Sequence, residues 1–142
     1  KRKGGHIVII GSASGLIGLS DFHDGYVVSK SALIRLAECI KLKFETKNIR
    51  VQIINPGFIN TNLISKKINT YFILPLDIAV NKIIKGINSN KFEICFPLNV
   101  YLWVKLLQFY PYKIYFLWIN FLNPLFMVGI KCFICDDLLQ LP

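Results

Sequence analysis

Two residues with complementary chemistry, Tyr26 and Lys30, stand four positions apart in the chain. On a helix, residues i and i+4 share one face, so the lysine ammonium would lie one turn from the approach to the tyrosine phenol. A cation beside a phenol favours the phenolate form, which brings proton exchange within reach of neutral pH. The pair therefore predicts general acid–base chemistry, although the same spacing also occurs on ordinary solvated helix faces.

The elements around this pair alternate between apolar runs and turn-forming residues. Residues 7–10 form an uninterrupted apolar run, typical of a strand buried on both faces of a parallel sheet. Residues 11–25 are rich in Ser, Gly and Asp and predict a loop. The pattern that follows predicts an α/β fold with parallel strands and right-handed crossovers: a helix over 24–46, a strand over 49–54, a helix over 75–88 and a strand over 91–96.

Both predicted helices carry apolar residues at helical spacing, and these faces are expected to cover the sheet. In the first helix, Leu33 and Ala37 widen a stripe with i+4 spacing, and Cys39 is expected on the same face as a small core residue. The stripe consists of Val28, Ala32, Leu36, Ile40 and Phe44. In the second helix the apolar positions are Ile78, Ile83, Ile84 and Ile87.

The order of these features resembles the active-site half of a short-chain dehydrogenase/reductase. The strand over 6–10 leads into Gly-Ser-Ala-Ser-Gly at 11–15, Tyr-x-x-x-Lys follows at 26–30, and the next strand runs into Asn-Pro-Gly-Phe-Ile-Asn-Thr at 55–61. The resemblance implies that Tyr26 is the general acid/base and that Lys30 favours its phenolate and binds the nicotinamide ribose. It also implies that Ser12 holds the substrate oxygen; Ser14 is the alternative, since one residue of slack in the loop would exchange the two.

The resemblance further implies a cofactor, NAD or NADP. Pro56 and Gly57 match the turn that packs against the nicotinamide ring, while the Ile59 backbone and Thr61 match positions that bind the carboxamide and pyrophosphate. The expected activity is hydride transfer between the nicotinamide and a small-molecule carbonyl or secondary alcohol. The apolar residues at 68–74 favour a lipophilic substrate.

Other parts of the family pattern do not occur in this sequence, including the turn Thr-Gly-x-x-x-Gly-x-Gly and the Asn-Asn-Ala-Gly segment. The chain is therefore expected to be the C-terminal half of a Rossmann-like doubly wound sheet, with a partial catalytic domain at 1–97 and a hydrophobic helical tail at 98–142. The strand over 6–10 would then lie at an open edge of the sheet. The alternative function is a catalytically silent remnant that acts as a membrane-associated or interaction module.

The tail carries two alternatives of its own. Residues 97–131 predict a pair of helices broken at Pro111 and Pro124, which would cover the sheet edge or form a contact in a homo-oligomer. Membrane contact is the other reading, because aromatic residues and lysines cluster there as interfacial anchors do. The uncharged run at 114–130 is borderline in length for a membrane span.

Composition excludes several classes of partner. The net charge of +9 comes from 17 Lys+Arg against 8 Asp+Glu, but the basic residues are dispersed and the aromatics gather in the tail, so nucleic acid is not expected as a partner. Cys132 and Cys135 have the spacing of a redox motif but lack a second cysteine pair, so no metal site is expected. The cysteines and the lack of a signal peptide favour a cytoplasmic location, with membrane association through 97–131 as an addition.

Overall fold

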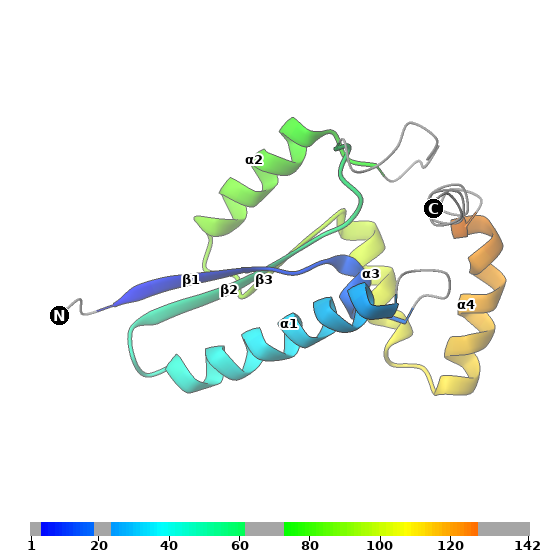
Figure 1. Cartoon of the computed structure of the whole chain (residues 1–142), viewed down its shortest axis with the longest axis horizontal. Coiled ribbons are helices and arrows are strands. Elements are labelled where there is room, and N and C mark those ends of the chain that lie inside the picture. The colour runs from blue at the N-terminus through cyan, green and yellow to red at the C-terminus, as the bar shows by residue number, and fades with distance from the viewer. Residues whose placement is uncertain (1–3, 19–23, 62–72, 128–142) are drawn as a thin grey trace, which may run out of the picture.

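The computed structural model describes residues 4–18, 24–61 and 73–127. It contains a parallel sheet in the order β1-β2-β3, with β1 at Gly5–Ile10, β2 at Ile49–Pro56 and β3 at Glu93–Phe96 (Figure 1). The helix α1 (Asp24–Phe44) connects β1 to β2, and α2 (Leu76–Ile87) precedes β3. A short 3-10 helix, η1 (Ala13–Leu16), follows β1. The predicted α/β class with three parallel strands is confirmed.

The sheet lies between two layers of helix, each with its own core. On one face, Ile53 of β2 packs with Ile34 and Ala37 of α1, with Leu16 of η1 and with Val104 of α3 (Leu98–Leu107). On the other face, α2 covers a second cluster, made of Ile54, Ala79, Ile94 and Phe96. Successive residues of a strand point to opposite faces, so β2 supplies both cores in turn.

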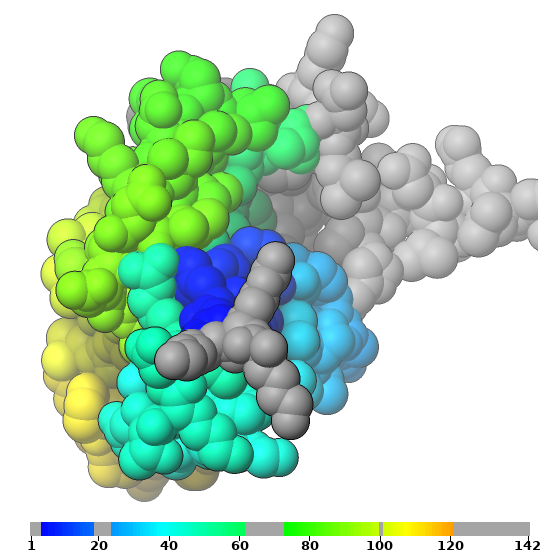
Figure 2. Space-filling view, turned by 90° about the vertical axis from the view of Figure 1, so that its left-hand side faces the viewer, coloured from blue at the N-terminus to red at the C-terminus, as the bar shows by residue number. Residues whose placement is uncertain are grey.

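Among the described strands, the middle strand β2 is the one most fully buried on both faces. Residues 51–55 of β2 are buried, including the polar Gln52 and Asn55. In β1, by contrast, residues 7–9 are half-buried and Ile10 is exposed, so the prediction for this strand was wrong. The reason is position: within the described residues β1 pairs with β2 alone, and Figure 2 shows its atoms at the surface between α2 and α1.

The predicted apolar face of α1 was only partly right. Val28 and Leu36 are 66% and 50% exposed, and Cys39 is exposed as well, whereas Ala37, which the prediction included, and Ile34, which it did not, are buried. The helix is rotated so that Ile34 and Ala37, and not the whole predicted stripe, face β2. Helix α2 shows a milder form of the same error, because two of the four predicted positions are exposed, Ile78 and Ile84.

The tail forms α3 and α4 (Tyr112–Met127), separated at Pro111 as predicted. Pro124 lies inside α4, so the second predicted break was wrong. A proline removes one backbone hydrogen bond, and a helix can bend at that point without ending there. No helix in the described part of the chain is long and apolar enough to cross a bilayer.

Candidate active site

The carboxyl ends of β1 and β2 lie side by side and carry most of the predicted site residues. The strands pair in parallel register from Gly5–Ile49 to Ile10–Ile54, and the Gly11 amide continues the pairing by donating to the Ile54 carbonyl at 2.7 Å. Ser12 and Pro56 therefore leave the sheet at the same edge. In open parallel sheets, this edge is where ligands bind.

Ser12 caps the short helix that follows β1. Its Oγ accepts a hydrogen bond from the Ser14 amide at 3.3 Å and lies 2.8 Å from the Ser14 Oγ. The two serines that the sequence could not separate are thus in direct contact. Both residues are half-buried.

Lys30 links α1 to the end of β1. Its Nζ donates to the Ile10 carbonyl at 3.3 Å and lies 5.6 Å from the centre of the Tyr26 ring. The lysine therefore stands next to the tyrosine and beside the residue that leads into Gly11 and Ser12. Tyr26 is 43% exposed, which leaves its ring accessible from outside the molecule.

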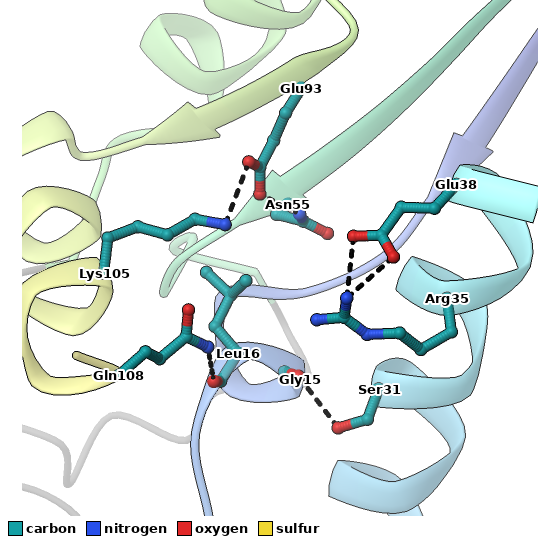
Figure 3. Close-up of polar contacts among 9 residues, drawn as sticks. All are labelled: Gly15, Leu16, Ser31, Arg35, Glu38, Asn55, Glu93, Lys105 and Gln108. Atoms are coloured by element: carbon teal, nitrogen blue, oxygen red, sulfur yellow. Dashed lines mark hydrogen bonds and ion pairs between the residues drawn. The ribbon is translucent and has the colours of Figure 1, made fainter. Parts of the chain in front are cut away.

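The serine loop, residues 11–18, is fixed to α1 at a close backbone contact. The Ser31 Oγ donates to the Gly15 carbonyl at 2.8 Å (Figure 3). A Cβ atom on Gly15 would lie 2.7 Å from the Lys30 carbonyl carbon, so only glycine allows the loop to approach the helix this closely. The backbone of Lys30 therefore packs directly against the loop that carries Ser12.

Gly57 ends β2 in a similarly tight position. Its amide donates to the Phe96 carbonyl at 2.7 Å, and a Cβ there would lie 3.0 Å from Pro97 Cδ. Farther along, Ile59 forms an isolated bridge with Leu74, and Thr61 is exposed. Residues 62–72, which include most of the apolar segment expected to meet the substrate, lie outside the described residues.

Asn55 is a buried polar residue whose place sequence reasoning missed. Its Nδ2 donates to Glu93 Oε1 at 2.9 Å, while its Oδ1 is buried and has no hydrogen-bond partner among the described residues. That oxygen faces Gly11, where an added Cβ would meet it at 2.1 Å. The only signal in the sequence was that an asparagine directly precedes Pro56.

Glu93 joins this asparagine to the tail. Its Oε2 accepts from the Tyr101 hydroxyl at 2.7 Å. The same oxygen pairs with Lys105 Nζ at 3.3 Å (Figure 3). Burial, and then the hydrogen bond to Glu93, raise the pKa of Tyr101. Burial, and then the nearby charge of Glu93, raise the pKa of the Cys95 thiol to about 12. These groups stay protonated at neutral pH and form a support beneath the site.

His6, the one histidine within the described residues, lies away from this edge. Its Nε2 is 2.7 Å from Gln52 Oε1, and its Nδ1 is 3.0 Å from an Arg50 nitrogen. Gln52 in turn donates to carbonyls at the end of α2 and in the following turn, among them Lys91 at 2.7 Å. These contacts give His6 a structural role. His23, Cys132 and Cys135 lie outside the described residues.

A parallel sheet flanked by helices, with a Ser loop, a Tyr-x-x-x-Lys helix and a Pro-Gly turn around one edge, defines a dehydrogenase-type α/β fold. A family model described as short chain dehydrogenase matches residues 1–71, half of the chain. This protein belongs to that family.

A curated relative, Dehydrogenase/reductase SDR family member 7B of Mus musculus, is 43% identical over 63 residues, 44% of this chain and 19% of the relative. The chain thus spans about a fifth of the length of this relative. The fold is similar to a short chain dehydrogenase from Burkholderia cenocepacia in complex with NADP, with a TM-score of 0.62, 19% identity and coverage of 72% of this chain and 43% of that one. It is also similar to a short-chain dehydrogenase from Sphingobium yanoikuyae in complex with NADPH, with a TM-score of 0.61, 21% identity and coverage of 71% and 41%.

Proposed function

We propose that residues 1–97 form the catalytic half of an NAD(P)-dependent oxidoreductase that interconverts a carbonyl and a secondary alcohol. The observation that carries the proposal is the position of Lys30, whose ammonium binds the Ile10 carbonyl at the carboxyl end of β1 and lies 5.6 Å from the Tyr26 ring. A lysine so placed can act on the tyrosine and on a ligand at the sheet edge together. Residues 98–142 are a hydrophobic helical tail in this proposal, and its first helix, α3, packs on the core through Val104.

The donors at this edge suit the nicotinamide end of the cofactor. The phenol of Tyr26, the ammonium of Lys30 and the Pro56-Gly57 turn can face the nicotinamide ring and its ribose, with Thr61 for the carboxamide and pyrophosphate end. The nicotinamide, when bound, exchanges a hydride with the substrate carbon. The other pyrophosphate contacts are assigned to the turn Thr-Gly-x-x-x-Gly-x-Gly, which does not occur in residues 1–142.

Residues of this chain then bind the substrate oxygen and transfer its proton. The Ser12 hydroxyl, with Ser14 as its neighbour, holds the substrate oxygen by a hydrogen bond. In reduction, the Tyr26 hydroxyl gives its proton to that oxygen, and the O–H bond breaks as the carbonyl becomes an alcohol. In oxidation, the phenolate takes the proton back, and Lys30 stabilises that phenolate by its charge.

We assign the substrate to the lipophilic carbonyl compounds and secondary alcohols. Ile10 is exposed at the end of β1. Leu74 bridges Ile59, beyond the end of β2, and packs against the core under α2. Apolar side chains therefore border the polar site. They favour a substrate that buries a hydrocarbon part beside the reacting oxygen.

The test uses a polypeptide in which residues 1–142 follow a dinucleotide-binding half, and it measures NADH and NADPH oxidation with a panel of lipophilic ketones. Replacing Tyr26 with Phe removes the transferable proton and should lower kcat by about a thousandfold with little change in cofactor affinity. Lys30→Ala should impair both kcat and cofactor binding. Tyr112→Phe, on an exposed tyrosine of α4, is the matched control. Near-normal turnover by Tyr26→Phe with every substrate would refute the assignment.

A second candidate function, membrane-surface attachment at the cytoplasmic side, is favoured by the exposed side of α4. Tyr112, Phe116, Leu117 and Trp118 are all exposed, next to Lys113. Aromatic and apolar residues beside a lysine, in a chain of net charge +9, match the chemistry of an anionic lipid surface. This function requires no catalysis and would also suit a catalytically silent remnant.

Vesicle sedimentation separates this candidate from a simple core-covering role. The intact chain should bind anionic vesicles more strongly than neutral ones, and added salt should weaken the electrostatic share of that binding. Replacing Phe116 and Trp118 with Ser should release the protein into the soluble fraction. If the intact chain stays soluble and does not bind anionic vesicles, the proposed membrane-surface attachment is refuted.

A further inference from the structure

We propose that the tail helices α3 and α4 position the serine loop through Gln108 and Tyr115. These helices lie beyond residue 71, where the family match ends. The inference rests on the proposed function, because the loop carries Ser12, the residue assigned to the substrate oxygen. It adds two positioning residues in a part of the chain with no assigned role.

The first contact comes from the end of α3. The Gln108 side chain donates from its Nε2 to the Leu16 carbonyl (Figure 3). Leu16 itself is buried in the core that Val104 of α3 completes, so an apolar contact and a hydrogen bond act on the same residue. The Leu16 side chain is thus held by packing, and its backbone carbonyl is held by the side-chain amide of Gln108.

The second contact comes from α4. The Tyr115 hydroxyl accepts from the Gly18 amide at 3.0 Å and donates to the Gly18 carbonyl at 3.2 Å. One phenol therefore satisfies both backbone groups of a single residue. Burial raises the pKa of Tyr115, so its hydroxyl remains protonated and keeps its donor.

These contacts complete a clamp whose other side is α1. Ser31 holds Gly15 from α1, Gln108 holds Leu16 from α3, and Tyr115 holds Gly18 from α4. The loop between β1 and α1 is therefore fixed at three places after Ser12. Small displacements of a group that binds the reacting atom lower the rate steeply, so a clamp on this loop acts on kcat more than on cofactor binding.

Hydrogen–deuterium exchange on residues 1–142 tests the clamp without requiring activity. Tyr115→Phe keeps the ring that meets Phe116 edge to face but removes the hydroxyl. It should speed exchange in the peptide covering 11–18 by about fivefold, the loss expected for one hydrogen bond. Gln108→Ala should do the same. The peptide covering β2 should keep its protection. The control, Tyr112→Phe, changes a tyrosine on the same helix that is 78% exposed.

Unchanged exchange at 11–18 in both variants would overturn the clamp. Faster exchange in β2 as well as in the loop would also overturn it, since the contacts would then serve general stability. In the polypeptide that joins residues 1–142 to a dinucleotide-binding half, Tyr115→Phe should lower kcat at least about threefold, while the KM for NAD(P)H stays within about twofold. Faster exchange at 11–18 with an unchanged kcat would refute the positioning role. An inactive parent polypeptide would refute the proposed function, and the exchange result alone would then test whether Gln108 and Tyr115 hold the loop.

Discussion

Replacing Gly15 with alanine tests the contact between the serine loop and α1. The added Cβ would lie 2.7 Å from the Lys30 carbonyl carbon, 2.8 Å from the Ser31 nitrogen and 2.9 Å from the Lys30 oxygen. All three atoms are backbone atoms of a helix, which cannot turn aside as a side chain can. Ordinary contact begins at 3.4 Å, so loop and helix must separate by 0.7 Å (3.4 − 2.7).

The cost of this separation follows from two contributions. Overpacking of a close-packed contact costs about 1–3 kcal/mol. The Ser31–Gly15 hydrogen bond, 2.8 Å long, would stretch with the same movement, and its weakening adds about 0.5–1.5 kcal/mol. The free energy of unfolding should therefore fall by about 2–4 kcal/mol, a large share of the total for a small domain.

Urea unfolding of residues 1–142, followed by circular dichroism, measures the change. Gly25→Ala is the matched control, because Gly25 lies in the first turn of α1 and a Cβ there meets nothing within 4 Å. This control should be neutral or up to about 1 kcal/mol more stable, since alanine is the better helix former. Equal stabilities for Gly15→Ala and Gly25→Ala would show that the loop does not pack against the Lys30 backbone.

Three further predictions concern the support under the site and the cofactor. Burial and Glu93 raise the Cys95 pKa from 9.0 to about 12, so the stability that the protonated thiol contributes is complete below pH 9 and disappears as the pH rises towards 12. In urea unfolding, the parent should therefore lose stability more steeply at alkaline pH than Cys95→Ala, and an equal pH dependence of the two proteins would contradict this. Glu93→Gln should lower stability by about 1–3 kcal/mol, whereas the same change at Glu38, whose ion pair with Arg35 is largely exposed, should cost no more than about 0.5 kcal/mol. In a calorimetric titration, residues 1–142 alone should bind NADH and NADPH very weakly, and micromolar affinity would be the contrary result.

Local sequence patterns predicted the order of the strands and α-helices, but they missed η1, which lies in the segment predicted as a loop. Apolar runs marked the strands, and Pro111 marked the division of the tail, because these signals depend on neighbouring residues. The Tyr-x-x-x-Lys spacing also placed Lys30 beside Tyr26, since the helix alone determines that relation. What remained open was which side of each element faces its neighbours.

Tertiary packing decided those sides. On α1 the contact with β2 selected Ala37 from the predicted face together with Ile34 from outside it, and it left Val28 and Leu36 exposed. The burial of Asn55 could not be predicted, because its partner Glu93 is 38 residues away and reaches it only when β3 pairs with β2. The choice between Ser12 and Ser14 depends on the site with substrate present.

Among the described residues β1 pairs with β2 alone, and its other side makes this strand a template. Gly5–Ile10 contains no lysine, proline or acidic residue, and these are the residues with which proteins usually discourage a foreign strand from joining an edge. An added strand would hydrogen-bond to the amides and carbonyls on that side of β1. A preceding segment of the same polypeptide would occupy the template at a fixed, high effective concentration, whereas separate copies would compete for it only as the protein is concentrated. Whether this protein associates with further copies in solution therefore depends on which segment pairs with β1.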